Sequence, residues 1–174
     1  MTYEDFKLSA QTGDALLVHG HSAVQQTIEA VTNSAFCHVA LLVVNPVIGL
    51  LVCEMVEGCG YQCMTIDDWV AGRPGQQFFF GKAPNIVLQN SQKIIDSLKE
   101  YEDKDRQKYG YGELFTVWLS QFTGKNYATP HEVCSLFVQH RWEVAGFPTP
   151  GCMSPGEFLF VCESVSRIQF PETA

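Results

Sequence analysis

Cys134 is the residue whose chemical type and position most favour covalent catalysis. It precedes the run Ser-Leu-Phe-Val early in an expected helix. The free N–H groups and the positive end of the helix dipole favour a thiolate there, and the thiolate is the nucleophilic form of cysteine. We interpret Cys134 as a nucleophile. The alternative is an inert core cysteine, because free cysteine is among the most often buried residue types.

A thiol nucleophile needs a base, and His38 is the strongest candidate because it begins an otherwise apolar segment. Glu54 lies in the next apolar segment, where a carboxylate without a partner is unfavourable. A buried Glu54 facing His38 would accept a hydrogen bond from the imidazole and hold the tautomer that a base requires. The alternatives are a histidine bonded to a backbone carbonyl and a glutamate turned to solvent, as we expect for Glu57.

Two further positions near these residues are interpreted as structural. Cys37 adjoins His38, but neighbouring side chains on a strand point to opposite faces, so we assign Cys37 to the core. His19 and His21 are a possible metal pair, yet no third ligand follows at a recognisable spacing. We therefore interpret this histidine pair as part of a turn.

The remaining candidate ligands and nucleophiles give weaker signals. Cys53, Cys59 and Cys63 have a C-x5-C-x3-C spacing that matches no zinc knuckle, which favours structural thiols. His131 lies three residues before Cys134 and could share its helical face, but an exposed histidine at a helix start is the simpler interpretation.

Composition limits the classes of partner. The 174 residues suit one domain, which we place at 1–174, and 46% apolar against 17% charged residues supply ample material for a core. The formal net charge is −8 and no basic run occurs, which argues against nucleic acid or an anionic membrane as a partner. We expect a small-molecule, peptide or lipid-like acyl substrate. No cofactor is required, and the oligomeric state stays open.

The sequence also predicts a cytoplasmic protein with free thiols. Residues 1–7 lack the basic and apolar regions of a signal peptide. The longest apolar stretch, residues 39–53, is broken by Asn45-Pro46 and Gly49 and is shorter than the ~20 residues of a membrane helix. Seven cysteines, an odd number, argue against a disulfide framework in a chain of this size.

The elements that must position these residues follow from periodicity and capping. We predict strands at residues 15–18, 38–44, 50–56, 77–80 and 158–165, and helices at 23–31 (capped by Ser22), 67–73, from 90 or 91 onward, about 109–122 and 129–145. Thr129-Pro130-His131-Glu132 has the pattern of a capping box with Pro at the first helical position. The order of elements predicts an α+β fold.

Six short motifs follow one another between residues 13 and 160: Gly13-Asp14-Ala-Leu-Leu-Val, Phe36-Cys37-His38-Val39-Ala40-Leu41, Val52-Cys53-Glu54, Tyr109-Gly-Tyr-Gly, Val133-Cys134-Ser135-Leu136-Phe137-Val138 and Ser154-Pro155-Gly156-Glu157-Phe158. In this order they resemble the circularly permuted NlpC-type cysteine peptidases. The resemblance implies a papain-like domain with a central antiparallel sheet flanked by helices, in which the histidine strand precedes the cysteine helix. It also implies a Cys134–His38–Glu54 triad.

The substrate class stays open within that resemblance. Leu136 stands where the family commonly has Glu, and Cys37 where it has a small polar residue. The related lecithin:retinol acyltransferase-like branch usually has a second histidine at the position of Glu54, so it is the less similar branch. We expect a cysteine peptidase or amidase. A thioesterase or lipid acyltransferase on the same fold, and a non-catalytic binding or structural module, are the alternatives.

Overall fold

The structure is a computed structural model that describes residues 1–31, 33–102 and 133–170. The helices and strands follow one another along the chain in this order: α1 (Tyr3–Ser9), β1 (Ala15–His19), α2 (Ala23–Val31), β2 (His38–Asn45), β3 (Gly49–Val56), β4 (Gly60–Thr65), α3 (Ile66–Ala71), β5 (Gln77–Lys82), α4 (Asn85–Gln89), α5 (Ser91–Glu102), α7 (Cys134–Val144), the 3₁₀ turn η1 (Pro155–Glu157), α8 (Phe158–Val161) and β6 (Ser164–Arg167).

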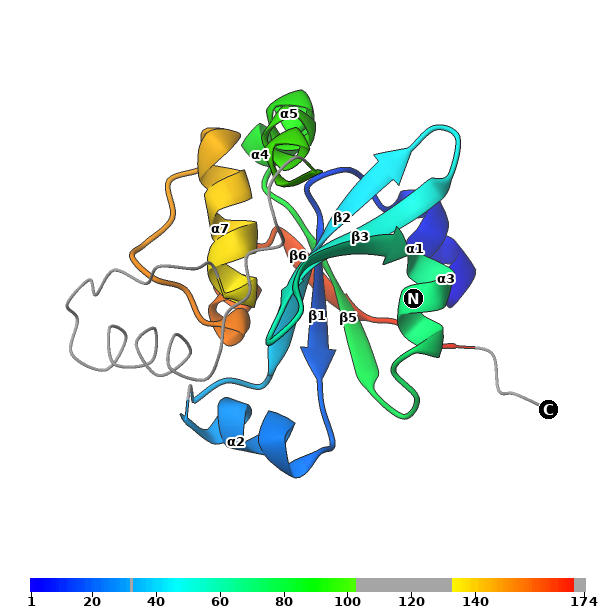
Figure 1. Ribbon diagram of the computed structural model, residues 1–174, viewed down its shortest axis with the longest axis vertical. Helices are drawn as coiled ribbons and strands as arrows, with labels where there is room; N and C mark the ends of the chain where they lie inside the picture. Colours follow the sequence, from blue (N-terminus) through cyan, green and yellow to red (C-terminus); the bar gives the residue numbers. More distant parts are fainter. Residues whose placement is uncertain (32, 103–132, 171–174) are drawn as a thin grey trace.

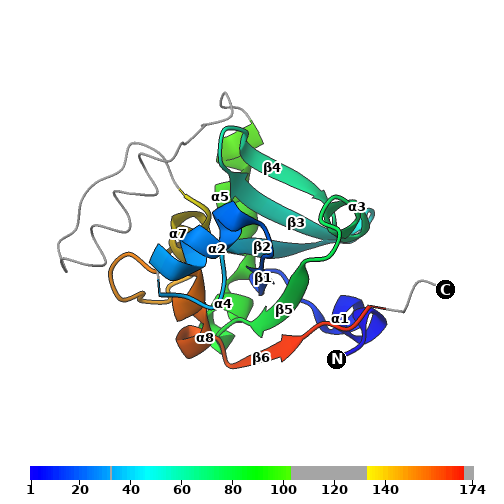
Figure 2. The same cartoon turned by 90° about the horizontal axis from the view of Figure 1, so that it is seen from below.

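One six-stranded antiparallel sheet runs through the centre of the described part of the chain, in the order β4-β3-β2-β1-β5-β6 (Figures 1 and 2). Strand β2 lies in the middle, with Val39 opposite Leu17 of β1 and Leu41 opposite Cys53 of β3. This register brings the start of β2 alongside the second half of β3, so His38 and Glu54 lie near the same end of the sheet.

Helices cover both faces of the sheet, which explains the nearly continuous apolar runs of the central strands. Helices α5 and α7 pack on one face, and α1 and α3 lie on the other (Figure 1). Side chains alternate between the two faces along each strand. Leu17 therefore joins Trp142 of α7 in one apolar cluster, while its neighbour Leu16 joins Trp69 of α3 in the other.

The segments with the strongest apolar periodicity form the helices and strands that the sequence predicts. Helix α2 has the predicted bounds, and the hydroxyl of Ser22 accepts a hydrogen bond from the backbone N–H of Gln25 at 3.2 Å. The 38–44 and 50–56 segments form the β2–β3 hairpin, and α5 begins at Ser91. The predicted α+β class, with an antiparallel sheet flanked by helices, is confirmed.

Two predicted boundaries are wrong. The helix expected over 129–145 begins only at Cys134, because Val133 has extended backbone angles (φ −83°, ψ 168°). The strand expected over 158–165 is instead the short helix α8 followed by β6. The capping box that begins at Ser154 starts a helical turn here. A short apolar run after such a turn can form a helix as readily as a strand. The Thr129–Glu132 motif and the predicted 109–122 helix lie outside the described residues.

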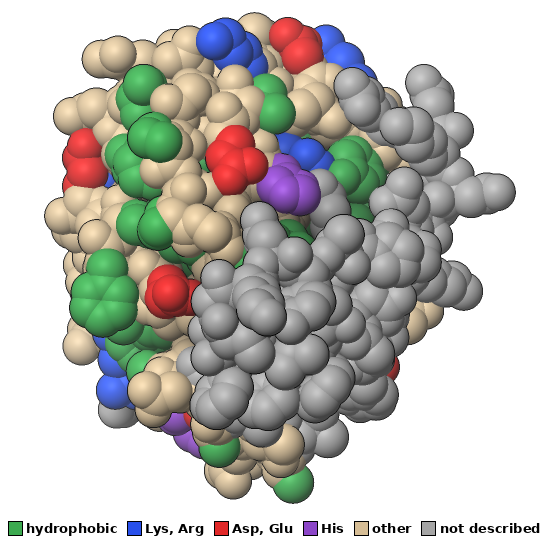
Figure 3. Space-filling model, turned by 90° about the vertical axis from the view of Figure 1, so that its left-hand side faces the viewer, with side chains coloured by type: hydrophobic (Ala, Val, Ile, Leu, Met, Phe, Trp, Pro, Cys, Tyr) green, Lys and Arg blue, Asp and Glu red, His purple; other side chains and the backbone are tan. Residues whose placement is uncertain are grey.

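The described surface has few large exposed apolar side chains. Val144 at the end of α7 and Leu159 and Phe160 of α8 are among them, and Phe160 is 86% exposed. On the side shown in Figure 3, hydrophobic side chains gather in a band toward the left. Within the described ranges, none of the helices is long and apolar enough to cross a lipid bilayer.

Asp14 connects β1 to the end of β5 from a fully buried position. Its Oδ1 accepts a hydrogen bond from the backbone N–H of Ala83 and its Oδ2 from that of Gln11, both at 2.8 Å. The ammonium of Lys82 lies 3.3 Å from Oδ2. Burial raises the pKa of Asp14, and these donors offset part of that rise. The carboxylate therefore satisfies the buried backbone N–H of Ala83 as well as that of Gln11.

We predict that Asp14→Ala lowers the free energy of unfolding by about 3 kcal/mol, because it leaves the buried N–H of Ala83 without an acceptor. Urea denaturation measures the change. The matched control is Asp96→Ala, which removes an exposed ion pair with Lys99 and should change stability by less than about 0.5 kcal/mol. Equal effects of the two substitutions would contradict the role given to Asp14.

Candidate active site

Cys134 is the first residue of α7, at the end of the helix that presents free N–H groups. Its N-cap residue, Val133, provides no side-chain hydrogen bond. Instead, the backbone N–H groups of Val39 and Ser135 hydrogen-bond to the thiol sulfur of Cys134. Because α7 begins at Cys134, this residue lies in the first rather than the second turn, where the helix dipole favours a thiolate most strongly.

His38 and Glu54 face one another, as predicted from the sequence. His38 begins β2, and its Nε2 lies 2.7 Å from Oε2 of Glu54 on β3. Glu54 is fully buried, whereas the side chain of His38 is 18% exposed and can be reached from solvent. His38 also hydrogen-bonds to Cys134, and since Nε2 is engaged by Glu54, Nδ1 is the ring nitrogen left for the thiol.

Arg73 is a site residue that sequence reasoning missed. Its guanidinium donates to Oε1 of Glu54 at 2.6 Å and lies over the Trp69 ring, 4.0 Å from the ring centroid. It also donates to the carbonyl oxygen of Trp69 at 3.2 Å. Arg73 follows α3, and the only local signal was the four-residue spacing of an aromatic and an arginine. Its main partner is 19 residues away in the chain.

Charges and hydrogen bonds shift the pKa values of Glu54, His38 and Cys134 more than burial does. Burial by itself raises the pKa of Glu54, but His38 and Arg73 outweigh burial and lower it. Burial by itself lowers the pKa of His38, but the negative Cys134 and Glu54 raise it to about 10. Burial likewise raises the pKa of Cys134, while His38 and the two backbone N–H groups bring it below the ordinary value. The arrangement favours a thiolate–imidazolium pair at neutral pH.

A pocket of about 180 Å³ opens over Cys134 and His38. Residues from α2, from β1, from the end of β3 and from the segment after α3 line it: Val18, Gln25, Ile28, Cys37, Val56, Glu57, Arg73 and Gln76. Among the described residues, the side-chain oxygen of Gln76 is buried and accepts no hydrogen bond. The pocket thus combines apolar walls with a buried acceptor that has no partner within the described part of the protein.

Cys37 lies in the apolar core and also borders the pocket. Its thiol donates to the carbonyl oxygen of Val18 at 3.4 Å and is 5% exposed. Burial raises the pKa of Cys37 to about 12, with Glu29 adding to the rise. The prediction that Cys37 belongs to the core is confirmed.

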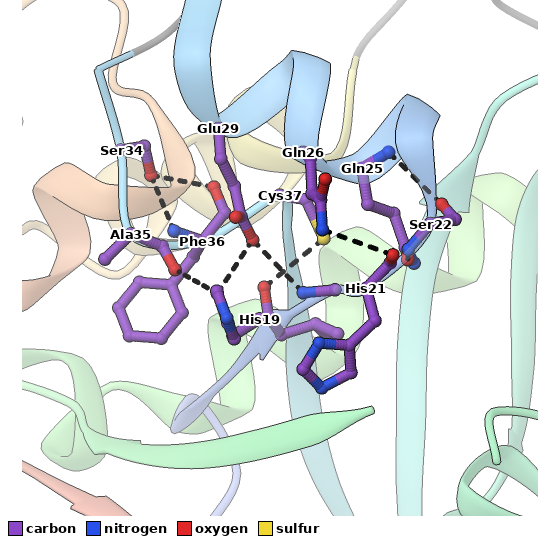
Figure 4. A network of polar contacts seen from close by, with 12 residues as sticks. His19, His21, Ser22, Gln25, Gln26, Glu29, Ser34, Ala35, Phe36 and Cys37 are labelled. Atoms are coloured by element: carbon purple, nitrogen blue, oxygen red, sulfur yellow. Dashed lines mark hydrogen bonds and ion pairs between the residues drawn. The ribbon is translucent and has the colours of Figure 1, made fainter. Parts of the chain in front are cut away.

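His19 and His21 belong to a polar network between β1 and α2 (Figure 4). The Nδ1 atom of His19 lies 3.0 Å from Oε1 of Glu29 and 3.1 Å from the carbonyl oxygen of Ala35. The same Glu29 oxygen accepts the backbone N–H of Gly20 at 3.1 Å. In the parts of the chain that the structure describes, no three His, Cys, Asp or Glu side chains are grouped as metal ligands. His131 lies outside these parts.

Comparisons with known proteins give little beyond the fold. No family model matches the sequence, and a search of curated proteins found no significant match. Among solved structures, the metalloprotein yiiX from Escherichia coli O157:H7 is similar, with a TM-score of 0.51 and 16% sequence identity. The alignment covers 92% of this chain and 98% of that one. At this identity the similarity concerns the fold alone.

We predict that Cys134 is alkylated by iodoacetamide with a midpoint below the free-thiol pKa of about 8.5, because His38 and the backbone N–H groups favour the thiolate. Peptide-resolved mass spectrometry against pH measures it. His38→Ala should move the midpoint up, because it removes the positive charge that stabilises the thiolate. The exposed His21 gives the control, since His21→Ala should leave the curve unchanged. Curves for parent and His38→Ala that overlay near 8.5 would show that no ion pair exists.

Proposed function

We propose that this protein is a thiol-dependent hydrolase of amide bonds, with a circularly permuted papain-like fold of the NlpC type. The observation that carries the proposal is the row of Cys134, His38 and Glu54, in which His38 lies 2.7 Å from the buried Glu54 carboxylate and lines one pocket together with Cys134. The order of the three residues along the chain, histidine strand, glutamate strand and then cysteine helix, is the order that the sequence resemblance implies.

In the proposed reaction, the thiolate of Cys134 attacks the substrate carbonyl carbon, and the carbonyl oxygen becomes an oxyanion. The backbone N–H of Cys134, at the helix start, supports this charge. His38 gives its proton to the leaving amine as the C–N bond breaks. Water, deprotonated by His38, then hydrolyses the thioester, which releases the acid and restores the thiolate and the protonated imidazole. Glu54 orients the imidazole and stabilises its charged form throughout.

Gln76 favours an amide over an ester as the bond that is cleaved. Its buried oxygen, which accepts no hydrogen bond from the described residues, would accept one from a substrate N–H group, which peptides have and esters lack at the scissile bond. The apolar wall made by Val18, Ile28 and Val56 favours the second candidate, a thioesterase or lipid acyltransferase, because it suits an acyl chain. Although yiiX is a metalloprotein, the described residues of this chain offer no three-ligand set for a metal, and the proposed steps use none.

We predict that Cys134→Ala lowers hydrolysis of an acyl amide by at least about a thousandfold, because it removes the sulfur on which the thioester forms. Glu54→Gln should lower it by about a hundredfold, because an amide still orients the ring but does not stabilise the imidazolium. Matched acyl-amide, acyl-ester and acyl-thioester substrates, together with mass spectrometry of an acyl adduct on Cys134, measure both.

Glu57→Gln is the matched control, because Glu57 lines the same pocket. The carboxylate that the structure pairs with His38, by a hydrogen bond and an ion pair, is that of Glu54. Glu57→Gln should leave turnover within about threefold of the parent. Turnover of the thioester with no detectable turnover of the amide would favour the second candidate. Turnover that survives Cys134→Ala would contradict the role given to Cys134. No adduct and no turnover with any of the three substrates would favour a non-catalytic module.

A further inference from the structure

Cys53 and Cys63 lie directly opposite one another on neighbouring antiparallel strands. The register of β3 and β4 pairs them, and their Sγ atoms are 2.9 Å apart. Both are thiols rather than halves of a disulfide; Cys53 is buried and Cys63 is exposed. The proposed hydrolytic chemistry uses neither residue. Two thiols in contact, one of them open to solvent, form an arrangement that the active site does not explain.

We propose that Cys53 and Cys63 are a redox-active dithiol that closes to a cross-strand disulfide. Directly opposed residues of antiparallel strands have Cα atoms about 4.5 to 5.5 Å apart, which lies inside the range that disulfides span. The bond therefore forms without breaking the pairing of β3 with β4. It needs only a small approach of two sulfur atoms that already touch.

The oxidant that suits this pair is a small disulfide such as oxidised glutathione. The exposed Cys63, as thiolate, attacks one sulfur of glutathione disulfide and releases one glutathione thiolate, leaving a mixed disulfide on the protein. Cys53 then loses its proton and attacks the Cys63 sulfur, which releases the second glutathione. Two protein thiols are oxidised and one glutathione disulfide is reduced to two thiols.

The two cysteines have different roles in this exchange. The hydrogen bond to Cys63 and burial raise the pKa of the Cys53 thiol well above its ordinary value. Cys53 therefore does not react with the oxidant first; it resolves the mixed disulfide once Cys63 has brought the reacting sulfur next to it. This assignment makes Cys63 the thiol that small reagents modify.

The nearby Cys59 is not the partner of either residue. It lies in the turn that joins β3 to β4, beyond the last paired residues, Val56 and Gly60. Residues 61 and 62 separate this last pair from Cys63 along β4. A bond from Cys59 to Cys63 would have to fold the end of the hairpin back on itself, whereas a bond from Cys53 to Cys63 follows the existing ladder.

A closed disulfide would brace the edge of the sheet next to the active-site pocket. Strand β4 is an edge strand of the described sheet, paired with β3 on one side only. The turn of this hairpin begins at Val56 and Glu57, which line the pocket. We therefore expect oxidation to slow amide hydrogen exchange in β4. The pair stands independently of the proposed hydrolysis, since neither cysteine contributes to Cys134 chemistry.

The test uses the full chain carrying Cys134→Ala, so that the proposed nucleophile takes no part. The folded protein is incubated with oxidised glutathione, quenched in acid and labelled with N-ethylmaleimide. Cleavage at Met55, Tyr61 and Met64 then places Cys53, Cys59 and Cys63 on separate peptides. We expect labelling to be lost together at Cys53 and Cys63, and a peptide pair lighter by two hydrogens. Dithiothreitol should restore the labelling of both cysteines.

Two variants in the same background make the result decisive. Cys59→Ser should leave the Cys53–Cys63 bond unchanged, and Cys63→Ser should leave Cys53 fully labelled and β4 exchange unaffected by the oxidant. The proposal is overturned if the oxidised parent carries a stable glutathione on Cys63, if Cys59 is the residue linked to Cys63, or if Cys53 stays labelled in the parent. None of these outcomes bears on whether Cys134 hydrolyses amides.

Discussion

The arrangement of this protein's site depends on a fully buried carboxylate. Glu54 has no exposed surface, and an unpaired charge in such a place is unfavourable by several kcal/mol. Its two oxygens therefore have separate cationic partners, His38 at Oε2 and Arg73 at Oε1. These partners come from β2 and from the segment after α3, so the carboxylate ties the β2–β3 pairing to the position of α3. Removing either partner would leave charge without compensation.

The same carboxylate sets the state of Cys134 from a distance. The negative Cys134 and Glu54 together raise the pKa of His38 to about 10 against the effect of burial, and the positive ring in turn favours the thiolate. The first turn of α7 adds N–H groups at the sulfur. A pair of this kind titrates as a unit, so its pH behaviour belongs to both residues together. The pocket of about 180 Å³ opens over this pair of residues.

Part of the fold and of the candidate site could be predicted from the sequence. The buried hairpin and α2 have strong apolar periodicity, and the unfavourable burial of a lone carboxylate predicted the contact of Glu54 with His38. Strand β4 was not predicted as an element because it is an edge strand whose residues are only partly buried. Arg73 was missed because its partner Glu54 lies 19 residues away on β3, and the four-residue spacing of an aromatic and an arginine is a weak local signal. The start of α7 was predicted too early because a capping pattern marks a candidate helix start and does not exclude a later helix start.

The most direct test of the thiolate–imidazolium pair is the protonation state of His38. Nitrogen NMR of the ¹⁵N-labelled imidazole reports it, with the resonance assigned by comparison with His38→Ala. We expect a doubly protonated ring at neutral pH that titrates with a pKa of about 10, and a lower pKa in Cys134→Ala, where the negative sulfur is gone. A ring that is uncharged at neutral pH in the parent, with a pKa that Cys134→Ala leaves unchanged, would contradict the thiolate–imidazolium pair.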